Sequence, residues 1–328
     1  LLVTSMINNG NLYAVIMRTI NVVIIAMVFD LFQDKPETLI NSLLICFEIT
    51  IYINAVSMVL FPTGFAIDQD HEKEWILGHY ITQYRWFLPA ICLSLIYMHL
   101  TGKHKRSIML ISVSLFSALF AGSVGVIVGL FATLFLYCLP NVRNKVRIWW
   151  GAAISCAFFI SIVVMRMQYL FKDIIVNILH RDLSFTGRIY IWDAALIIFR
   201  RNYLIGNGYY YSLPIPQWAG QETQYASHAH CQLLEVLMQG GIVYLILLCV
   251  MLIELSKRLN INQNIYSEII QCSIFGIFVY GLTDVFLTSP LIYIVFLIGF
   301  CSPSLQTDLA SKRKKYDFTK YAKENYII

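Results

Sequence analysis

The sequence predicts an all-α membrane protein that crosses the bilayer several times. Of its 328 residues, 58% are hydrophobic and 13% are charged, whereas a soluble domain carries roughly a quarter charged residues. Apolar runs of about eighteen or more residues recur along the chain, and each can cross a hydrocarbon core of about 30 Å. Lipid offers unpaired backbone groups no partner, so only helices or a closed barrel can span it. The runs do not alternate as barrel strands would, and helices are therefore expected.

About nine apolar segments are candidate transmembrane helices. They are 12–32, 39–61, 86–100, two within 108–139, 149–165, 233–253, 265–282 and 290–301. The 108–139 segment is too long for one crossing, and the small residues of Ala121–Gly125 predict a tight turn at its middle. Arg18 and Asn21 make the first segment less apolar than the others. The chain begins with Leu1 and no methionine, so we expect that its natural N-terminus is missing.

The positions of lysine and arginine predict the orientation. If the segments alternate in direction, four basic stretches fall on one side, namely 102–106, 141–147, 256–258 and 312–315. Cytoplasmic loops are enriched in lysine and arginine, so this side is expected to be cytoplasmic. The loops 62–85 and 166–227 then face outward. The net charge of +5 follows from this topology and needs no nucleic-acid partner.

This topology divides the chain into four regions. Residues 1–165 would form the N-terminal transmembrane helices, and residues 166–228 one long extracytoplasmic segment between the sixth and seventh spans. Residues 229–303 would form the C-terminal transmembrane helices, and residues 304–328 a basic cytoplasmic tail. The candidate functional residues are concentrated in the extracytoplasmic segment and directly after it.

Four outward arginines run against the usual charge bias of membrane proteins. They are Arg181, Arg188, Arg200 and Arg201. A guanidinium group binds phosphate oxygens through paired hydrogen bonds and keeps its charge, which suits a diphosphate ligand without a metal. Alternatively, these arginines anchor the interface or pair with nearby acids, namely Asp182, Asp193 and Glu222. Trp192 follows Arg188 by four residues and would share its helix face.

Two histidines, His228 and His230, directly precede the apolar run 233–253. A neutral imidazole can accept a proton from a sugar hydroxyl near neutral pH, so either is a candidate general base. On a helix, side chains at positions i and i+2 point apart, and we expect neither a shared metal site nor two histidines facing one substrate. The alternative is a structural role at the membrane interface. The eight cysteines include no CxxC pair, and neither a disulfide framework nor a metal centre is indicated.

Three stretches carry a resemblance to a known family. The first is TGRIYIWDAALIIFRRNYLIGNGYYY (186–211), with its GR pair, its tryptophan and an L-x-G-x-G turn. The second is His230 followed, after two residues, by LLEVLMQGGIVY (233–244), which contains the pair Gly240 and Gly241. The third combines FPTGF (61–65) with EWILGHY (74–80) and Pro89. At these residues the sequence resembles the O-antigen polymerase and ligase superfamily, and most closely the Wzy-type polymerases of bacterial capsular and other surface polysaccharides.

This resemblance implies a membrane glycosyltransferase of GT-C-like fold in the bacterial cytoplasmic membrane. It would polymerise undecaprenyl-diphosphate-linked oligosaccharides at the outer face by inverting transfer, without metal or cofactor. His230 would act as the base and Arg188 would bind the diphosphate. Further substrate contacts would come from Arg181, Arg200, Arg201, Trp192 and His228.

Two alternatives remain at this point. A ligase would use the same chemistry to hand the glycan to another acceptor. A lipid-linked-sugar flippase or other transporter would instead be expected to show inverted repeats and ionisable groups at mid-membrane. For a polymerase, the partners would be the lipid-linked substrate and the bilayer, with a flippase and a chain-length regulator as further candidates.

Overall fold

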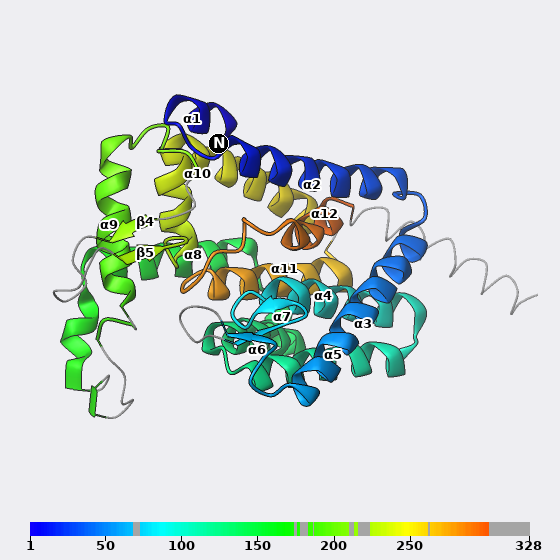
Figure 1. Ribbon diagram of the computed structural model, residues 1–328. Helices are drawn as coiled ribbons and strands as arrows, with labels where there is room; N and C mark the ends of the chain where they lie inside the picture. The colour runs from blue at the N-terminus through cyan, green and yellow to red at the C-terminus, as the bar shows by residue number, and fades with distance from the viewer. Residues whose placement is uncertain are drawn as a thin grey trace, which may run out of the picture.

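The structure is a computed structural model and is mainly helical (Figure 1). The residues it describes are 1–67, 73–173, 176–177, 183–185, 187–209, 213–215, 224–261 and 263–301.

Every predicted span coincides with helical structure in this part of the chain. The helices are α2 (Leu12–Leu31), α3 (Pro36–Leu60), α4 (Tyr84–Thr101), α5 (His104–Ala121), α6 (Val124–Cys138), α8 (Ile148–Phe158) with the π-helix η1 (Phe159–Val164), α10 (Gln232–Ile261), α11 (Ile265–Tyr280), and the 3-10 turn η4 (Pro290–Ile292) with α12 (Tyr293–Phe300). Three of them, α2, α3 and α10, are long and apolar enough to cross a membrane. The chain is therefore a helical, multi-pass membrane protein, and the number of nine crossings remains a prediction.

The predicted division of the 108–139 segment is confirmed. Helix α5 ends at Ala121 and α6 begins at Val124. Gly122, between them, adopts the left-handed conformation with φ 77°, which glycine reaches without the steric cost that other residues meet. Two residues therefore separate the end of α5 from the start of α6.

Two small antiparallel sheets correct the expectation of a purely α-helical chain. Between α3 and α4, β1 (Ala66–Ile67), β2 (Lys73–Trp75) and β3 (Gly78–His79) pair in sequence order. The other sheet pairs β4 (Leu213–Ile215) with β5 (Gln224–Ala226). These strands have two or three residues each, too few for an alternating pattern to be recognised in the sequence. The remaining short elements are α1 (Leu2–Ile7), α7 (Pro140–Arg143) and the 3-10 helix η2 (Met167–Phe171).

Helix α11 lies at the centre of the core and packs against α4, α6 and α8. Its contact with α6 is close because small residues face each other. A Cβ atom added at Gly276 would lie 2.7 Å from the Gly129 carbonyl oxygen. Small residues commonly allow such close contact between helices in membranes. At the end of α11, the Tyr280 ring stacks on Tyr84 with a centroid distance of 4.0 Å, which fixes the start of the following loop.

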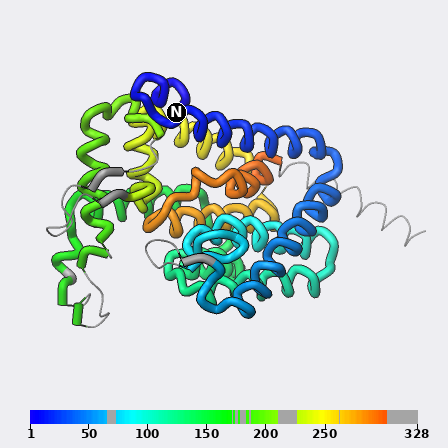
Figure 2. Tube along the Cα trace, in the orientation of Figure 1, coloured from blue at the N-terminus to red at the C-terminus, as the bar shows by residue number. Residues whose placement is uncertain are grey.

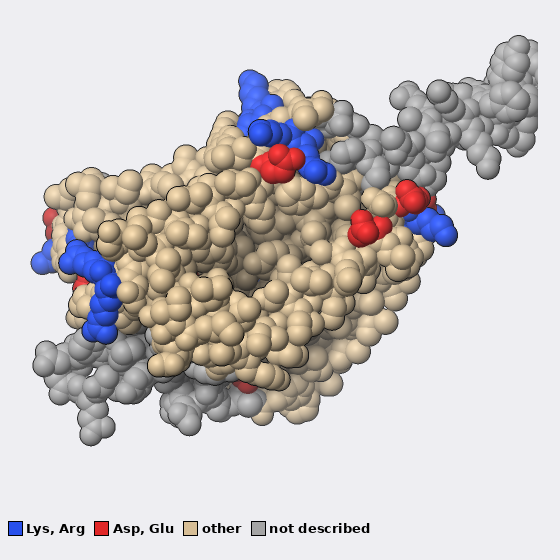
Figure 3. Space-filling model, turned by 90° about the horizontal axis from the view of Figure 1, so that it is seen from above, with Lys and Arg blue, Asp and Glu red and all other residues tan. Residues whose placement is uncertain are grey.

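The outer surface suits a lipid environment. Large apolar side chains are exposed along α2, α3 and the second half of α10. Figure 3 shows a broad surface free of charged side chains, with lysine, arginine, aspartate and glutamate confined to a few places near its edges. This distribution agrees with a body embedded in the bilayer.

One helix lies apart from the main bundle and positions the candidate functional residues. Helix α9 (Arg188–Arg201) packs beside the first half of α10, which then bends at Gly241 and continues along α2 (Figures 1 and 2). Gly241 has φ 63° and ψ −160°, outside the helical region. The bend separates α10 into two halves with different directions.

The turn after α9 docks on this bend through four backbone hydrogen bonds. Asn207 N–H donates to Met238 O at 2.9 Å and Gly208 N–H donates to Gln239 O at 2.8 Å. Beyond the bend, Ile242 and Val243 N–H donate to Tyr203 and Leu204 O at 2.9 and 3.0 Å. A Cβ atom at Gly206 would lie 2.4 Å from the Gln239 carbonyl, and one at Gly241 would lie 2.4 Å from Leu204 O. Glycines are therefore required where the two backbones meet.

Replacing Gly206 with alanine tests this close approach. Gly206→Ala adds a clash of about 1–3 kcal/mol to the backbone strain of about 1–2 kcal/mol that any alanine meets at positive φ. Gly102→Ala is the matched control, because Gly102 has a similar φ of 69° but nothing lies within 4 Å of its added Cβ. We expect the thermal unfolding midpoint of the detergent-solubilised protein to fall clearly further for Gly206→Ala. Equal shifts would show that the turn does not hold the bend.

Candidate functional site

The two histidines lie in a loop, residues 227–231, that joins β5 to α10. We call this segment the histidine loop. His230 adopts a left-handed conformation with φ 47°, which is uncommon for a residue other than glycine and is frequent at functional sites. The centroids of the His228 and His230 rings lie 4.0 Å apart. The prediction that the two side chains point apart is wrong, because helical geometry begins only at Gln232 and the turn at His230 brings both rings together.

Asp284 pairs with His228. It lies in the loop between α11 and η4 (281–289), and the residue is 2% exposed. His228 Nε2 and Asp284 Oδ1 are 2.9 Å apart. Tyr280 Oη donates to the other carboxylate oxygen at 2.8 Å, and the Val285 backbone N–H donates to Oδ1 at 2.7 Å. Burial by itself would raise the pKa of Asp284, but the His228 hydrogen bond and the nearby imidazoles lower it to about 2. Asp284 is therefore ionised and holds His228 in one orientation.

His230 presents an unprotonated imidazole. Burial is the main cause that lowers its pKa from 6.5 to about 3, and the neighbouring His228 and Arg188 add to the shift. Its buried Nδ1 has no hydrogen-bond partner in the described part of the chain. At neutral pH the ring is thus neutral, with one nitrogen able to accept a proton or a hydrogen bond and the other able to donate one.

Two buried side chains of α10 fix the histidine loop in place. The Glu235 carboxylate accepts a hydrogen bond from the Ala229 backbone N–H at 2.7 Å and another from Gln239. Gln232 Oε1 accepts from the Phe286 and Leu287 N–H groups at 2.7 and 3.0 Å. Because Ala229 lies between the histidines and Phe286 follows Asp284 by two residues, these bonds set the position of His228 against Asp284.

Arg188 is the first residue of α9 and follows Gly187, which has φ 83°. The positive end of a helix dipole favours a negative ligand, and the Arg188 guanidinium adds a full charge. Within the described ranges Arg188 forms no ion pair. Its charge contributes to the low pKa of His230, so the two side chains share one electrostatic environment. This end of α9 is suited to bind an anion.

The other predicted substrate contacts are placed differently. Trp192 is 1% exposed and packs against Phe158 and Phe185 in the core between α9 and α10. Arg200 and Arg201 are in the last turn of α9, about 18 Å along the axis from Arg188, and are not brought to the histidines. Arg181 lies outside the described residues. The substrate-binding roles of these four residues remain predictions.

One predicted acidic partner is bound by Arg166, which is not one of the four candidate arginines. Arg166 pairs with Asp193 and lies over the Trp192 ring, 5.8 Å from its centroid. The other two acids proposed as arginine partners, Asp182 and Glu222, lie outside the described residues. Asp193 is therefore paired with Arg166 and does not neutralise the charge of Arg188.

The histidine loop also brings potential metal ligands together. One ligand atom each from His228, His230 and Asp284 lies within 4.8 Å of the others. Imidazole nitrogens and carboxylate oxygens are typical zinc ligands. The residues therefore fit a divalent cation as well as acid–base chemistry, although the sequence analysis expected no metal here.

The fold and this site define a multi-pass membrane protein with a histidine–carboxylate cluster and, at the start of α9, an arginine whose charge acts on one of the histidines. Residues 107–249, which include Arg188 and His230, match the family model described as O-antigen ligase. This match confirms the predicted relationship to the O-antigen polymerase and ligase superfamily. No curated protein and no solved structure matched the chain.

Removing the Asp284 charge tests the histidine–carboxylate contact. Hydrogen bonds to charged groups contribute about 1.5–3 kcal/mol, so Asp284→Asn should loosen the His228 ring and expose its nitrogens. We expect diethyl pyrocarbonate to modify His228 several-fold faster in Asp284→Asn, as followed by mass spectrometry of the purified protein. Asp193→Asn is the control, since Asp193 bonds Arg166 instead. Unchanged His228 modification in Asp284→Asn would contradict the contact.

Proposed function

We propose that this protein is a membrane glycosyltransferase that polymerises lipid-diphosphate-linked oligosaccharides into a bacterial surface polysaccharide. The observation that carries the proposal is the histidine loop, with Asp284 on one ring and the Arg188 end of α9 nearby. The family match over residues 107–249 supports glycan transfer chemistry. Undecaprenyl diphosphate would be the lipid carrier, and the outer face of the cytoplasmic membrane would be the location.

The proposed reaction needs a base and a cation. The acceptor hydroxyl oxygen forms a bond to the anomeric carbon of the donor sugar, and its proton passes to His230. The bond between that carbon and the diphosphate oxygen breaks, and the electron pair leaves with the diphosphate. Arg188 and the α9 N-terminus stabilise the charge that develops on the leaving group, which is commonly the largest contribution to catalysis. Attack opposite the leaving group inverts the anomeric centre, and no metal is required.

The low pKa of His230 fits this sequence of events. Without substrate, burial and the positive charge of Arg188 keep the ring neutral. A bound diphosphate would offset the Arg188 charge and raise the pKa toward the range in which a general base is efficient. His228 is a second candidate for the base, because Asp284 orients its ring as the acid of a catalytic triad orients histidine.

Transfer to an acceptor other than a second repeat unit, as a ligase performs, uses the same residues. The family model is described as O-antigen ligase, and the match supports a ligase as well as it supports a polymerase. The two functions differ in their product, which is a ladder of repeats for a polymerase and a single transfer for a ligase. A flippase or transporter would produce neither.

Alanine variants of the two histidines test the site and the function in cells that make the polymer. Losing a general base typically costs about 10²–10⁴ in rate, enough to replace long chains with single repeats. His230→Ala should therefore keep the lipid-linked single repeat and abolish the ladder on a glycan gel, while His228→Ala shortens it. Membrane protein levels, measured by immunoblot, serve as the control. The opposite ranking would transfer the base to His228, and normal ladders from both variants would refute the site.

A further inference from the structure

The histidine loop and the loop after α11 bring three potential metal ligands close together. They are His228, His230 and Asp284, whose ligand atoms lie within 4.8 Å of one another. His228 Nε2 and Asp284 Oδ1 are already 2.9 Å apart. Two ligand atoms of a tetrahedral zinc ion, each about 2.0–2.1 Å from the metal, are about 3.3 Å apart. The ligand atoms therefore need to move by no more than about 1.5 Å to hold one ion.

The third ligand, His230, has a nitrogen without a partner. Its Nδ1 atom is buried and forms no hydrogen bond within the described residues. Buried polar atoms are normally paired, and an unpaired one commonly indicates an ion, a water molecule or a ligand. Neutral imidazole coordinates metals through either nitrogen. The hydrogen bond between His228 and Asp284 does not account for this unpaired nitrogen, whereas a ligand at His230 does.

The hydrogen bonds around the other two ligands resemble the outer shell of a metal site. Metal-binding histidines usually bond a polar group through their second nitrogen, and metal-binding carboxylates are hydrogen-bonded in turn. His228 Nδ1 lies 2.7 Å from Ser227 Oγ, and its Nε2 faces Asp284. The Asp284 carboxylate accepts from Tyr280 Oη at 2.8 Å and from the Val285 N–H at 2.7 Å. Both ligands are therefore oriented before a metal binds.

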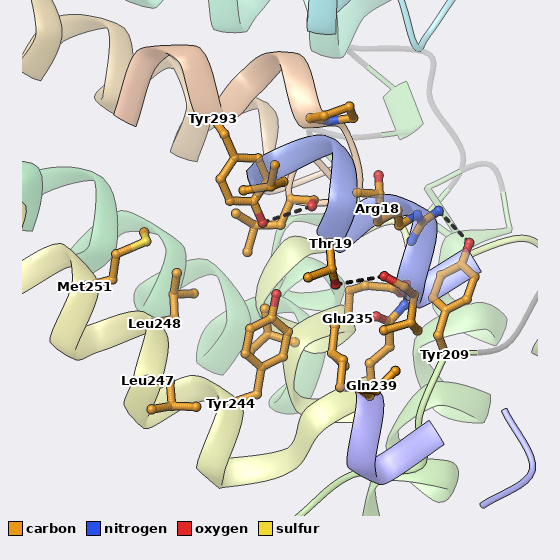
Figure 4. A pocket seen from close by; sticks show the side chains of 18 of the residues that line it. Arg18, Thr19, Tyr209, Glu235, Gln239, Tyr244, Leu247, Leu248, Met251 and Tyr293 are labelled. Atoms are coloured by element: carbon orange, nitrogen blue, oxygen red, sulfur yellow. Dashed lines mark hydrogen bonds between the residues drawn. The ribbon is translucent and has the colours of Figure 1, made fainter. Parts of the chain in front are cut away.

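The buried Glu235 supports the cluster without being one of its ligands. Its carboxylate accepts hydrogen bonds from the Ala229 N–H at 2.7 Å and from Gln239. Figure 4 shows Glu235 and Gln239 lining a cavity together with Arg18, which donates to Tyr209 Oη at 2.6 Å. Because Ala229 lies between the two histidines, Glu235 holds the backbone that carries them.

The ligand types select a class of metal ion. Imidazole suits zinc, copper and nickel, whereas magnesium and calcium prefer oxygen ligands. The Asp284 carboxylate attracts a divalent cation, while Arg188, whose charge acts on His230, repels it. Three protein ligands also leave one position of a tetrahedral ion open, unlike a closed structural zinc site. We therefore expect an exchangeable ion.

We propose that His228, His230 and Asp284 form a regulatory site for a divalent transition metal ion of the zinc type. Coordination uses the nitrogen lone pair that a general base needs, so a bound ion blocks both histidines as proton acceptors. The ion therefore inhibits glycan transfer. This inhibition rests on the proposed function, whereas the metal binding does not.

Titration of the purified full chain, prepared without a histidine tag, tests the metal binding. Co²⁺ serves as the probe, because its visible absorption is strong in a tetrahedral site. We expect one Co²⁺ per chain, displaced by an equal amount of Zn²⁺, which binds such ligands more tightly, and not by excess Mg²⁺. Absence of this absorption in the wild-type protein, or displacement by Mg²⁺ as effective as by Zn²⁺, would overturn the proposal.

Variants identify the ligands. His230→Ala and Asp284→Asn each remove a ligand and should weaken Co²⁺ binding by about 100-fold or more, whereas Tyr280→Phe removes an outer-shell bond and should cost about tenfold. Arg188→Gln should strengthen binding several-fold, because it removes the repelling charge. His99→Ala is the control, since His99 lies on α4 outside the cluster. Unchanged binding in His230→Ala, or an equal loss in His99→Ala, would indicate an adventitious ion only and overturn the proposal.

Glycan extension is measured on the same samples, so that the two proposals can fail separately. We expect extension in the presence of a zinc chelator, loss of most extension with added Zn²⁺, and recovery with excess chelator. A cluster that binds Zn²⁺ in a protein that never extends glycans would keep the metal site and refute the proposed function. Extension by a protein whose cluster binds no Zn²⁺ would refute the metal site alone, and extension unaffected by bound Zn²⁺ would overturn its regulatory role.

Discussion

The backbone contact between the turn after α9 and the bend in α10 is the constraint on which the candidate site depends. Four hydrogen bonds join residues 203–208 to residues 238–243. At Gly206 and Gly241 the two backbone segments are too close to leave room for a side chain. The first half of α10 carries the residues that hold the histidine loop, and α9 begins with Arg188. Because this contact joins the two helices, it fixes the position of the imidazoles relative to the guanidinium. A GNG turn and a GG pair, separated by about thirty residues in the sequence, are thus one structural element.

Charge is distributed around this element so that a cation acts on a neutral imidazole. Asp284 is ionised and committed to His228, Tyr280 and its own loop. His230 is neutral because burial and the neighbouring Arg188 charge oppose its protonation. Arg188 forms no ion pair among the described residues. A diphosphate ligand, as proposed, would offset its charge.

The lengths of the apolar runs predicted the helices and the turn at 121–125. The positions of the arginines and histidines singled out Arg188, His228 and His230 as candidate functional residues. Both kinds of pattern can be seen within a short stretch of sequence. Three features were not accessible in this way. The close approach of the two imidazoles depends on the left-handed conformation of His230, just before α10 begins. Asp284 is a single acid between apolar segments, and its partner is distant in sequence. Arg18 only weakened a predicted span, because its hydrogen-bond partner Tyr209 lies 191 positions away in the sequence.

The central claim is that the histidine loop and Arg188 transfer a glycan from one lipid diphosphate to another. The most direct measurement uses purified protein in vesicles with a lipid-linked single repeat as sole substrate, counting released undecaprenyl diphosphate against new glycosidic bonds. We predict a ladder of products, one diphosphate released per bond, and loss of most activity in Arg188→Lys, which keeps the charge but loses the planar fork. Full activity of Arg188→Lys, or no product longer than a single repeat from the wild-type protein, would contradict the account.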